Sequence, residues 1–316
     1  MTEGKTEQRV VVGLGELLWD LLPEGARLGG APANFAVMAG RLGNRAVVAS
    51  RVGADALGDQ ARCELESLPA ECGHLQHDAE FATGTVTVAL EGGEPHYTIH
   101  EPAAWDRLAL TPEWRDLAQQ ADAVCFGTLA QRSEASRAAI LGFLDGTRRE
   151  CVRVFDVNLR PPHWTVDVLR DSLGRATILK LNGGELRHVL MGTGACPHPA
   201  GSQDDADLLR GARWLLERYP IEMVCITLGE RGSVLVTRRE QHRHQGLATR
   251  VRDTVGAGDA FTAALTHYYL EGAPLATMNE AGNQWGAWVA SQAGGMPPMK
   301  AETLERVSGE ILLRRG

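Results

Sequence analysis

Short runs of apolar residues alternate with stretches of helical periodicity along most of the chain. Unbroken apolar runs predict buried strands, and apolar residues spaced three and four apart predict helices. Strands are expected over residues 9–15, 45–52, 121–127, 151–157, 176–181 and 222–228. Helices are expected over residues 33–42, 56–68, 134–147, 166–173 and 206–218. This alternation predicts an α/β fold whose mostly parallel central sheet is covered by helices on both faces.

Two segments depart from this alternation. Residues 16–28 leave the first strand without starting a helix, and residues 83–101 alternate threonine with valine or glycine before Gly92 and Gly93. Alternating residues on either side of a Gly-Gly turn predict a β-hairpin. We therefore expect a small antiparallel sheet, built from about residues 16–30 and 82–102, that acts as a lid and excludes water.

The last third of the chain predicts two further strands followed by helices. Residues 229–247 have a strand-turn-strand pattern, and helical periodicity follows over residues 256–270, 275–293 and 301–314. The sequence contains no internal repeat or low-complexity tract. Residues 1–316 are therefore expected to form a single domain.

Composition and charge exclude several classes of protein. The 316 residues include 32 Lys+Arg and 40 Asp+Glu, for a formal net charge of −8, and the chain has no basic run. This charge disfavours nucleic-acid binding, which relies on basic surface. No apolar stretch approaches the ~20 residues of a membrane span. The polar residues 1–8 do not resemble a secretory signal, so we expect no membrane partner and a cytoplasmic location.

Two common nucleotide-binding motifs are missing. Gly13 and Gly15 follow a strand, but Leu18 occupies the third glycine position of a dinucleotide fingerprint. No glycine-rich loop ends in the Lys-Ser or Lys-Thr pair of a P-loop. A nucleotide would therefore need a different kind of phosphate site.

The segment from Arg252 to Phe261 offers such a site, since its glycine-rich turn leads directly into an apolar helix. The unpaired N–H groups at a helix start, together with the helix dipole, bind anions without a lysine. Asp259 lies in the first turn of this helix. It is either a functional group beside the anion or an acid that only stabilises the helix start.

Four more polar segments are expected near this turn. A second glycine-rich turn, residues 29–36, opens a helix with Asn34 as a ligand or as a simple cap. The other three follow strands: residues 156–160, 182–185 and 227–229. Ligands of open α/β sheets bind at the carboxyl ends of the strands. We therefore expect these segments to converge on one rim.

These motifs, in this order and spacing, resemble the ribokinase-like (PfkB) sugar kinase family. The shared segments are GGAPANFA, DVNLR, N-x-x-E, T-L-G-x-x-G and DTVGAGDAF, and the resemblance spans about residues 10–298. Residues 15–20 followed by GGAPANFA look most like fructokinases. The resemblance implies a ribokinase-like three-layer sandwich with the small sheet as its lid.

The resemblance also implies roles for residues around the acceptor. Asp259 would be the catalytic base, expected to stay ionised at pH 7 because the helix start favours its anion. Gly256, Ala257 and Gly258 would supply N–H groups to the transferring phosphoryl group. The residues at sugar-binding positions are Asp20, Gly30 and Asn34. Arg160 matches a residue near the sugar and the phosphates.

The nucleotide and ion positions follow from the same resemblance. Asn182 and Glu185 match the motif that holds Mg²⁺, with Glu185 acting through water. The expected nucleotide-binding residues are Thr227, Gly229 and, near the adenine, Asn283. Asp253 and Val255 match a monovalent-cation loop, usually for K⁺.

Two departures from the family pattern stand in these motifs. Gly183 and Gly184 fill the middle of N-x-x-E, which should loosen the following helix start. Val255 replaces a common threonine, so a cation there would be held largely by backbone carbonyls.

The expected function is ATP-dependent transfer of a γ-phosphoryl group to a hydroxymethyl group of a monosaccharide, with D-fructose favoured. A ribokinase, a nucleoside kinase or a kinase of a sugar acid such as 2-keto-3-deoxygluconate stays open. A non-catalytic sugar or nucleotide sensor is the alternative from another class, although such a protein would lack the base or the glycines. A homodimer through the lid is a further expectation because it would bury exposed strand edges.

Overall fold

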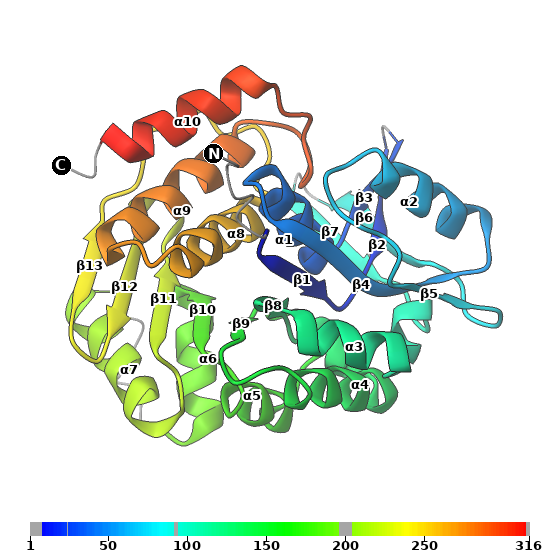
Figure 1. The fold of residues 1–316 in the computed structure, drawn as a ribbon, viewed down its shortest axis with the longest axis horizontal. Helices are drawn as coiled ribbons and strands as arrows, with labels where there is room; N and C mark the ends of the chain where they lie inside the picture. The colour runs from blue at the N-terminus through cyan, green and yellow to red at the C-terminus, as the bar shows by residue number, and fades with distance from the viewer. Residues whose placement is uncertain (1–7, 24, 92–93, 196–203, 314–316) are drawn as a thin grey trace, which may run out of the picture.

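The computed structural model describes residues 8–23, 25–91, 94–195 and 204–313. In these residues the central sheet has nine strands in the order β13-β12-β11-β10-β9-β8-β1-β4-β5 (Figure 1). Its strands are β1 Val10–Leu14, β4 Arg45–Gly53, β5 Leu75–Asp78, β8 Ala123–Phe126, β9 Val152–Asp156, β10 Ile178–Asn182, β11 Met223–Thr227, β12 Ser233–Thr237 and β13 Gln241–His244. Only β11–β12 and β12–β13 pair antiparallel among them, so the sheet is mostly parallel, as predicted.

A second, smaller sheet contains four described strands, the first of which follows β1 in the chain. It contains β2 Leu18–Leu22, β3 Gly25–Gly29, β6 Gly84–Glu91 and β7 Glu94–Ile99, in the order β3-β2-β6-β7. The outer pairs are antiparallel and β2–β6 is parallel, so this sheet is mixed rather than purely antiparallel. The predicted hairpin is present as β6–β7; its proposed turn, Gly92–Gly93, lies outside the described residues.

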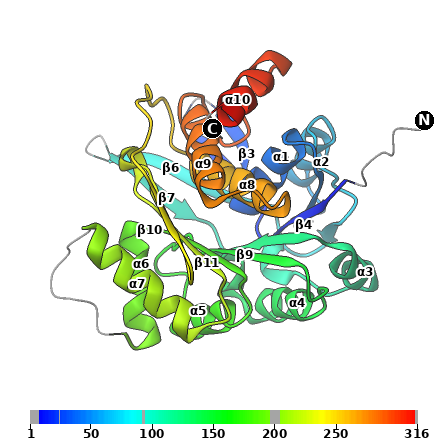
Figure 2. The ribbon, with the colours of Figure 1, turned by 60° about the vertical axis from the view of Figure 1, so that its left-hand side comes forward.

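Helices cover both faces of the central sheet and complete the three layers (Figure 2). One face carries α1 Ala31–Arg41, α2 Ala56–Glu66, α8 Ala257–Leu270, α9 Leu275–Ala290 and α10 Ala301–Leu313. The other carries α3 Pro112–Gln120, α4 Glu134–Asp145, α5 Val166–Leu173, α6 Gly183–Thr193 and α7 Asp205–Arg218. Three short 3₁₀ helices occur in the described connections: Ala104–Arg107, Leu129–Arg132 and Gly229–Arg231.

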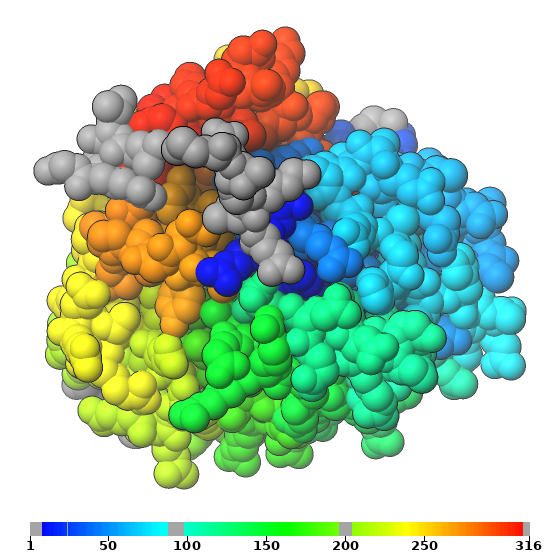
Figure 3. Space-filling model, viewed as in Figure 1, coloured from blue at the N-terminus to red at the C-terminus, as the bar shows by residue number. Residues whose placement is uncertain are grey.

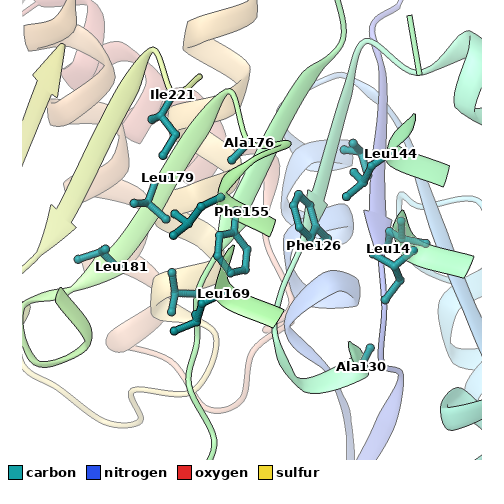
Figure 4. Close-up of a cluster of buried hydrophobic side chains, with 14 of the residues drawn as sticks. Leu14, Phe126, Ala130, Leu144, Phe155, Leu169, Ala176, Leu179, Leu181 and Ile221 are labelled. Carbon is teal, nitrogen blue, oxygen red and sulfur yellow. The ribbon is translucent and has the colours of Figure 1, made fainter. Parts of the chain in front are cut away.

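The apolar runs form two cores, one on each face of the central sheet. The close-up of one cluster shows strand and helix side chains packed together, with Phe126 and Phe155 of neighbouring strands at its centre (Figure 4). These two rings stack with centroids 5.2 Å apart. Strands β1 and β8 are apolar throughout, so each can bury side chains on both faces.

Distant parts of the chain meet on the first of these faces, where α8 packs against α1. The space-filling view shows the first third of the chain, coloured blue to cyan, beside the orange and red C-terminal helices (Figure 3). This contact brings the glycine-rich starts of α1 and α8 together. Within the described residues, no helix combines the length and apolar character needed to cross a membrane.

Candidate active site

The carboxyl ends of the parallel strands form one polar edge, as predicted. Asp156 ends β9, Asn182 ends β10 and Thr227 ends β11, while Glu16 follows β1. Asn182 and Thr227 are direct neighbours in the register of β10 and β11. The starts of α1 and α8 reach this same edge, because the N-cap of α1 closely approaches the Glu16 backbone and the Thr262 hydroxyl of α8 donates to Asp156 Oδ2 at 2.9 Å.

Asn34 and Asp259 join the two glycine-rich helix starts. The Asn34 Nδ2 donates a 2.8 Å hydrogen bond to Asp259 Oδ2 across 225 residues of sequence. Gly30 occupies the N-cap of α1, and no side chain caps that helix. The interpretation of Asn34 as a simple cap is therefore wrong; its amide holds the Asp259 carboxylate.

Burial dominates the charge state of Asp259. It raises the pKa of this carboxyl from 3.8 to about 6, with a further increase from Asp156. The Asn34 hydrogen bond and the charges of Lys180 and Arg160 oppose that increase. The value lies below 7, so the carboxylate is mostly ionised at neutral pH. Its pKa nevertheless moves in the opposite direction to the one expected from the helix start alone.

The turn before Asp259 requires glycine at its first position. Gly256 has a φ of 75°, and a Cβ there would lie 2.4 Å from the Gly295 Cα. Gly295 in turn approaches Asn34, since a Cβ on Gly295 would lie 2.5 Å from Asn34 Oδ1. Gly294 N donates to Asp253 Oδ2 at 2.9 Å. The sequence interpretation missed this segment, which packs the Gly256–Asp259 turn against Asn34.

Two buried oxygens near Asp259 lack a hydrogen-bond partner among the described residues: Glu16 Oε2 and Asn34 Oδ1. Both side chains are only 4 % exposed. Burial raises the pKa of Glu16 to about 7, and the nearby Asp259 carboxylate adds to the increase. Gly30, with a φ of 111°, allows the close approach, because a Cβ there would lie 2.5 Å from the Glu16 carbonyl oxygen.

Asp20 and Arg160 belong to the same charged group. Burial raises the pKa of Asp20 to about 6, and the Asp253 carboxylate adds to the increase. The Arg160 charge lowers the pKa values of Asp20, Glu16 and Asp259. Arg160 lies after β9 and is exposed, and its charge acts on all three carboxyl groups.

Asn182 and Glu185 form a capping box at the start of α6. The Asn182 side chain accepts from Gly184 N and Glu185 N. Glu185 accepts from Asn182 N and from Leu159 N, each at 2.8 Å. These bonds hold the helix start and oppose the loosening expected from Gly183 and Gly184.

The capping box leaves carboxylate lone pairs that could face a cation. Each Glu185 oxygen accepts one backbone N–H and retains acceptor capacity. The residues described by the structure contain no group of three or more His, Cys, Asp or Glu side chains arranged for a metal ion. A single carboxylate such as that of Glu185 nevertheless suits Mg²⁺. This ion keeps several waters and binds through one or two carboxylates plus phosphates.

In the predicted monovalent-cation loop, the Asp253 carboxylate already binds other groups of the protein. Asp253 accepts from Val255 N at 3.0 Å and Gly294 N at 2.9 Å, and it pairs with Arg27 of β3 at 3.4 Å. A cation in this loop would therefore rely on backbone carbonyls.

The other predicted nucleotide-binding residues lie on or next to β11 and α9. Gly229 has a φ of 62° with open space around it, so only its backbone conformation calls for glycine. Thr227 ends β11 beside Asn182. The Asn283 amide nitrogen binds Ser233 and Asn279 between α9 and β12, and its predicted role near an adenine stays a prediction.

A buried ammonium lies under the glycine turn, which the sequence interpretation missed. Lys180 Nζ is 3.0 Å from both carboxylate oxygens of Asp156 and would lie 3.0 Å from a Cβ on Gly258. The one available signal was a lysine within the otherwise apolar run 178–181, in a chain with only three lysines.

We expect Glu16→Gln to remove a pH-dependent loss of stability. The pKa of Glu16 is raised on folding from 4.5 to about 7, so the stability it supports is present below its unfolded pKa and lost as pH rises through 7. The wild type should lose about 3 kcal/mol through this group between pH 4 and pH 8. Urea unfolding at pH 4 and pH 8 measures this change in the free energy of unfolding. The control variant is Glu217→Gln, since Glu217 is exposed. An unchanged pH dependence in Glu16→Gln would contradict the assignment.

Comparisons with known proteins identify the family of the chain and relatives that share its fold. The profile of the family described as "pfkB family carbohydrate kinase" matches residues 25–302. A fructokinase from Salmonella typhimurium is 32 % identical over 268 residues, covering 80 % of this chain and 81 % of the relative. The crystal structure of an uncharacterized sugar kinase from Pyrococcus horikoshii in complex with ATP aligns with a TM-score of 0.79 at 26 % identity, covering 96 % and 99 % of the two chains.

A second solved structure has a sugar bound. The fructokinase from Vibrio cholerae O395 in its fructose-, ADP- and calcium-bound form aligns with a TM-score of 0.75 at 25 % identity, covering 95 % of this chain and 99 % of the other. The family profile spans most of the chain and the fold is shared over nearly all of it. The chain therefore belongs to the pfkB family of carbohydrate kinases.

Proposed function

We propose that this sugar kinase transfers the γ-phosphoryl group of ATP to a hydroxymethyl group of a monosaccharide, and that D-fructose is the acceptor. The observation that carries the proposal is the buried Asp259 carboxylate, held by Asn34 at 2.8 Å in the first turn after a glycine-rich anion site. Relatives solved with ATP, and with fructose and ADP, support the choice of both substrates.

Asp259 is the general base in this proposal. Its carboxylate accepts the proton of the acceptor hydroxymethyl group as the new O–P bond forms and the bond to the ADP oxygen breaks. A carboxylate with a pKa of about 6 is ionised at neutral pH and close enough to that pH to accept the proton efficiently. The step needs little covalent help, since phosphoryl transfer depends mainly on positioning and charge stabilisation.

The N–H groups of Gly256, Ala257 and Gly258 stabilise the charge on the transferring group, as donors at a helix start do. Arg160 adds a positive charge on the open side of the site. Mg²⁺, when bound through Glu185 and water, would neutralise phosphate charge. The loop at Asp253 and Val255 is our proposed site for K⁺.

Unpartnered acceptors at the site support a polyhydroxylated acceptor. Glu16 Oε2 and Asn34 Oδ1 are buried oxygens without a partner among the described residues, and Asp20 adds a carboxylate nearby. Hydroxyl groups of a sugar could donate to such oxygens. The small sheet, as a lid over this region, would exclude water and limit ATP hydrolysis.

The charges of the lid argue against a phosphosugar as acceptor. Arg27 is the one basic residue of residues 16–28, and it pairs with Asp253. Residues 83–101 contain no lysine or arginine. Residues 16–28 and 83–101 would therefore offer a second phosphate no lysine or arginine beyond Arg27, which favours an uncharged sugar.

A coupled ADP-release assay with Mg·ATP tests this choice. The acceptors are fructose, ribose, glucose, nucleosides and 2-keto-3-deoxygluconate, each with and without K⁺. We expect the highest kcat/KM with fructose. A higher kcat/KM with another acceptor would replace fructose by that acceptor. If folded protein that binds ATP released no ADP with any acceptor, a sensor would be favoured. Dimerisation through the lid and a cytoplasmic location stay predictions from the sequence.

A further inference from the structure

Lys180 lies at a point where the sheet meets the start of α8. It belongs to β10, and its side chain is buried. Its Nζ would lie 3.0 Å from a Cβ on Gly258, next to Asp259 in sequence. The ammonium therefore stands directly behind the turn whose N–H groups form the anion site.

Asp156 fixes this ammonium in place. Both of its carboxylate oxygens lie 3.0 Å from Lys180 Nζ. The Thr262 hydroxyl, one turn after Asp259, lies 2.9 Å from Asp156 Oδ2 and from the Gly258 carbonyl oxygen. Two strands and the first turn of α8 are thus linked through one buried network.

Stability alone does not explain a buried ion pair here. Desolvation of two charges offsets much of their attraction, and apolar residues of similar volume are often as stable. The position of the pair is informative instead, because its positive end faces the glycine turn. The Lys180 charge also acts on Asp259 and on Glu185, the two acids expected to serve the acceptor and the metal.

We propose that Lys180 is a positioning residue for phosphoryl transfer: its buried ammonium keeps the Asp259 carboxylate ionised and backs the anion site at Gly258. The inference rests on the proposed function. Lys180 acts through Asp259 and the turn rather than by touching the sugar. A Cβ at position 258 would crowd the ammonium at 3.0 Å, which favours glycine at this position.

The charge on Asp259 depends on groups from several elements. Asp156 of β9 raises its pKa, and Lys180 of β10 and Arg160 after β9 lower it. Asn34 of α1 donates to it, and Glu16 after β1 is a further carboxyl group coupled to it. Removing Lys180 or Asp156 should therefore move the Asp259 pKa in opposite directions.

The test is the Asp259 titration in substrate-free protein, followed by the carboxyl ¹³C shift and assigned by its loss in Asp259→Asn. Asp156→Asn should lower the midpoint by about one pH unit, and Lys180→Met should raise it by about as much. Lys180→Met made together with Asp156→Asn avoids an unpaired buried anion, so it should fold even where the single variant does not. The double variant should titrate about one unit above Asp156→Asn.

Kinetics give a second readout. Below pH 6, kcat of Lys180→Met should fall about tenfold further than that of the wild type, with little change in the sugar KM. Equal midpoints in Asp156→Asn and the double variant would overturn the proposal. That titration needs no turnover, so its failure is distinct from failure of the proposed function, which an inactive wild type would show.

Discussion

Asp259→Ala is expected to lower kcat/KM by about 10²–10⁴-fold while the protein stays folded, since this is the usual contribution of a general base. Asp259 Oδ2 is already held by Asn34 at 2.8 Å, so the loss arises from chemistry at a placed carboxylate. Coupled ADP release measures the rate, and thermal unfolding checks the fold. A fully active Asp259→Ala would remove Asp259 as the base.

Asp259→Asn separates catalysis from folding. Folding raises the pKa of Asp259 from 3.8 to about 6, so the stability linked to its protonation is present below pH 4 and lost as pH rises through 6. At pH 8 the neutral, isosteric variant should therefore be more stable than the wild type by about 3 kcal/mol, although it loses most of the activity. Lower stability at pH 8 would contradict the buried-carboxylate assignment.

The Asp259 pKa also determines how kcat/KM falls at low pH. The base must be deprotonated, so kcat/KM of the wild type should fall tenfold per pH unit below about 6. The residual rate of Asp259→Asn should lack this limb, because no carboxyl remains to titrate at position 259.

Gly256→Ala is expected to lower kcat by about 10²–10³-fold, as the loss of one positioned donor to a developing anion does. A Cβ at this left-handed position would lie 2.4 Å from the Gly295 Cα. The turn must therefore shift, and its N–H groups with it. The measurement is kcat with the fastest acceptor of the panel, together with the affinity for ADP.

Gly272→Ala is the matched control at the other end of α8. Gly272 has a φ of 66°, but a Cβ there would meet no atom within 4 Å beyond its own chain neighbours. This variant should lose only about 1 kcal/mol of stability from backbone strain and keep wild-type kcat. Equal kinetic losses in Gly256→Ala and Gly272→Ala would show that strain, rather than displacement of the anion site, causes the defect.

The order of strands and helices could be predicted because it depends on local pattern. Every expected strand and helix occurs, and the five helices on the first face include the three predicted at the C-terminal end. Helix α3 was missed because its nine residues carry few apolar positions. For α6 a helix start was expected at Gly183 and Gly184, but its extent to Thr193 was not predicted.

Only those site residues that lie within a recognisable sequence motif could be predicted. Asp259 and Asn34 were both identified, but their hydrogen bond joins residues 225 positions apart and required the packing of α1 on α8. Lys180, Asp156 and Glu16 gain their importance from burial and proximity, which no local pattern encodes. Gly295 likewise matters because its backbone meets Gly256 and Asn34.

The most direct test is ³¹P NMR of the wild-type protein with Mg·ATP and fructose. Transfer to a hydroxymethyl group should give a phosphomonoester signal coupled to two methylene protons, formed in equal amount with ADP and at least about 100-fold more slowly with Asp259→Asn. ADP accompanied only by inorganic phosphate, or a phosphomonoester that Asp259→Asn forms as fast as the wild type, would contradict a sugar kinase that uses Asp259 as its base.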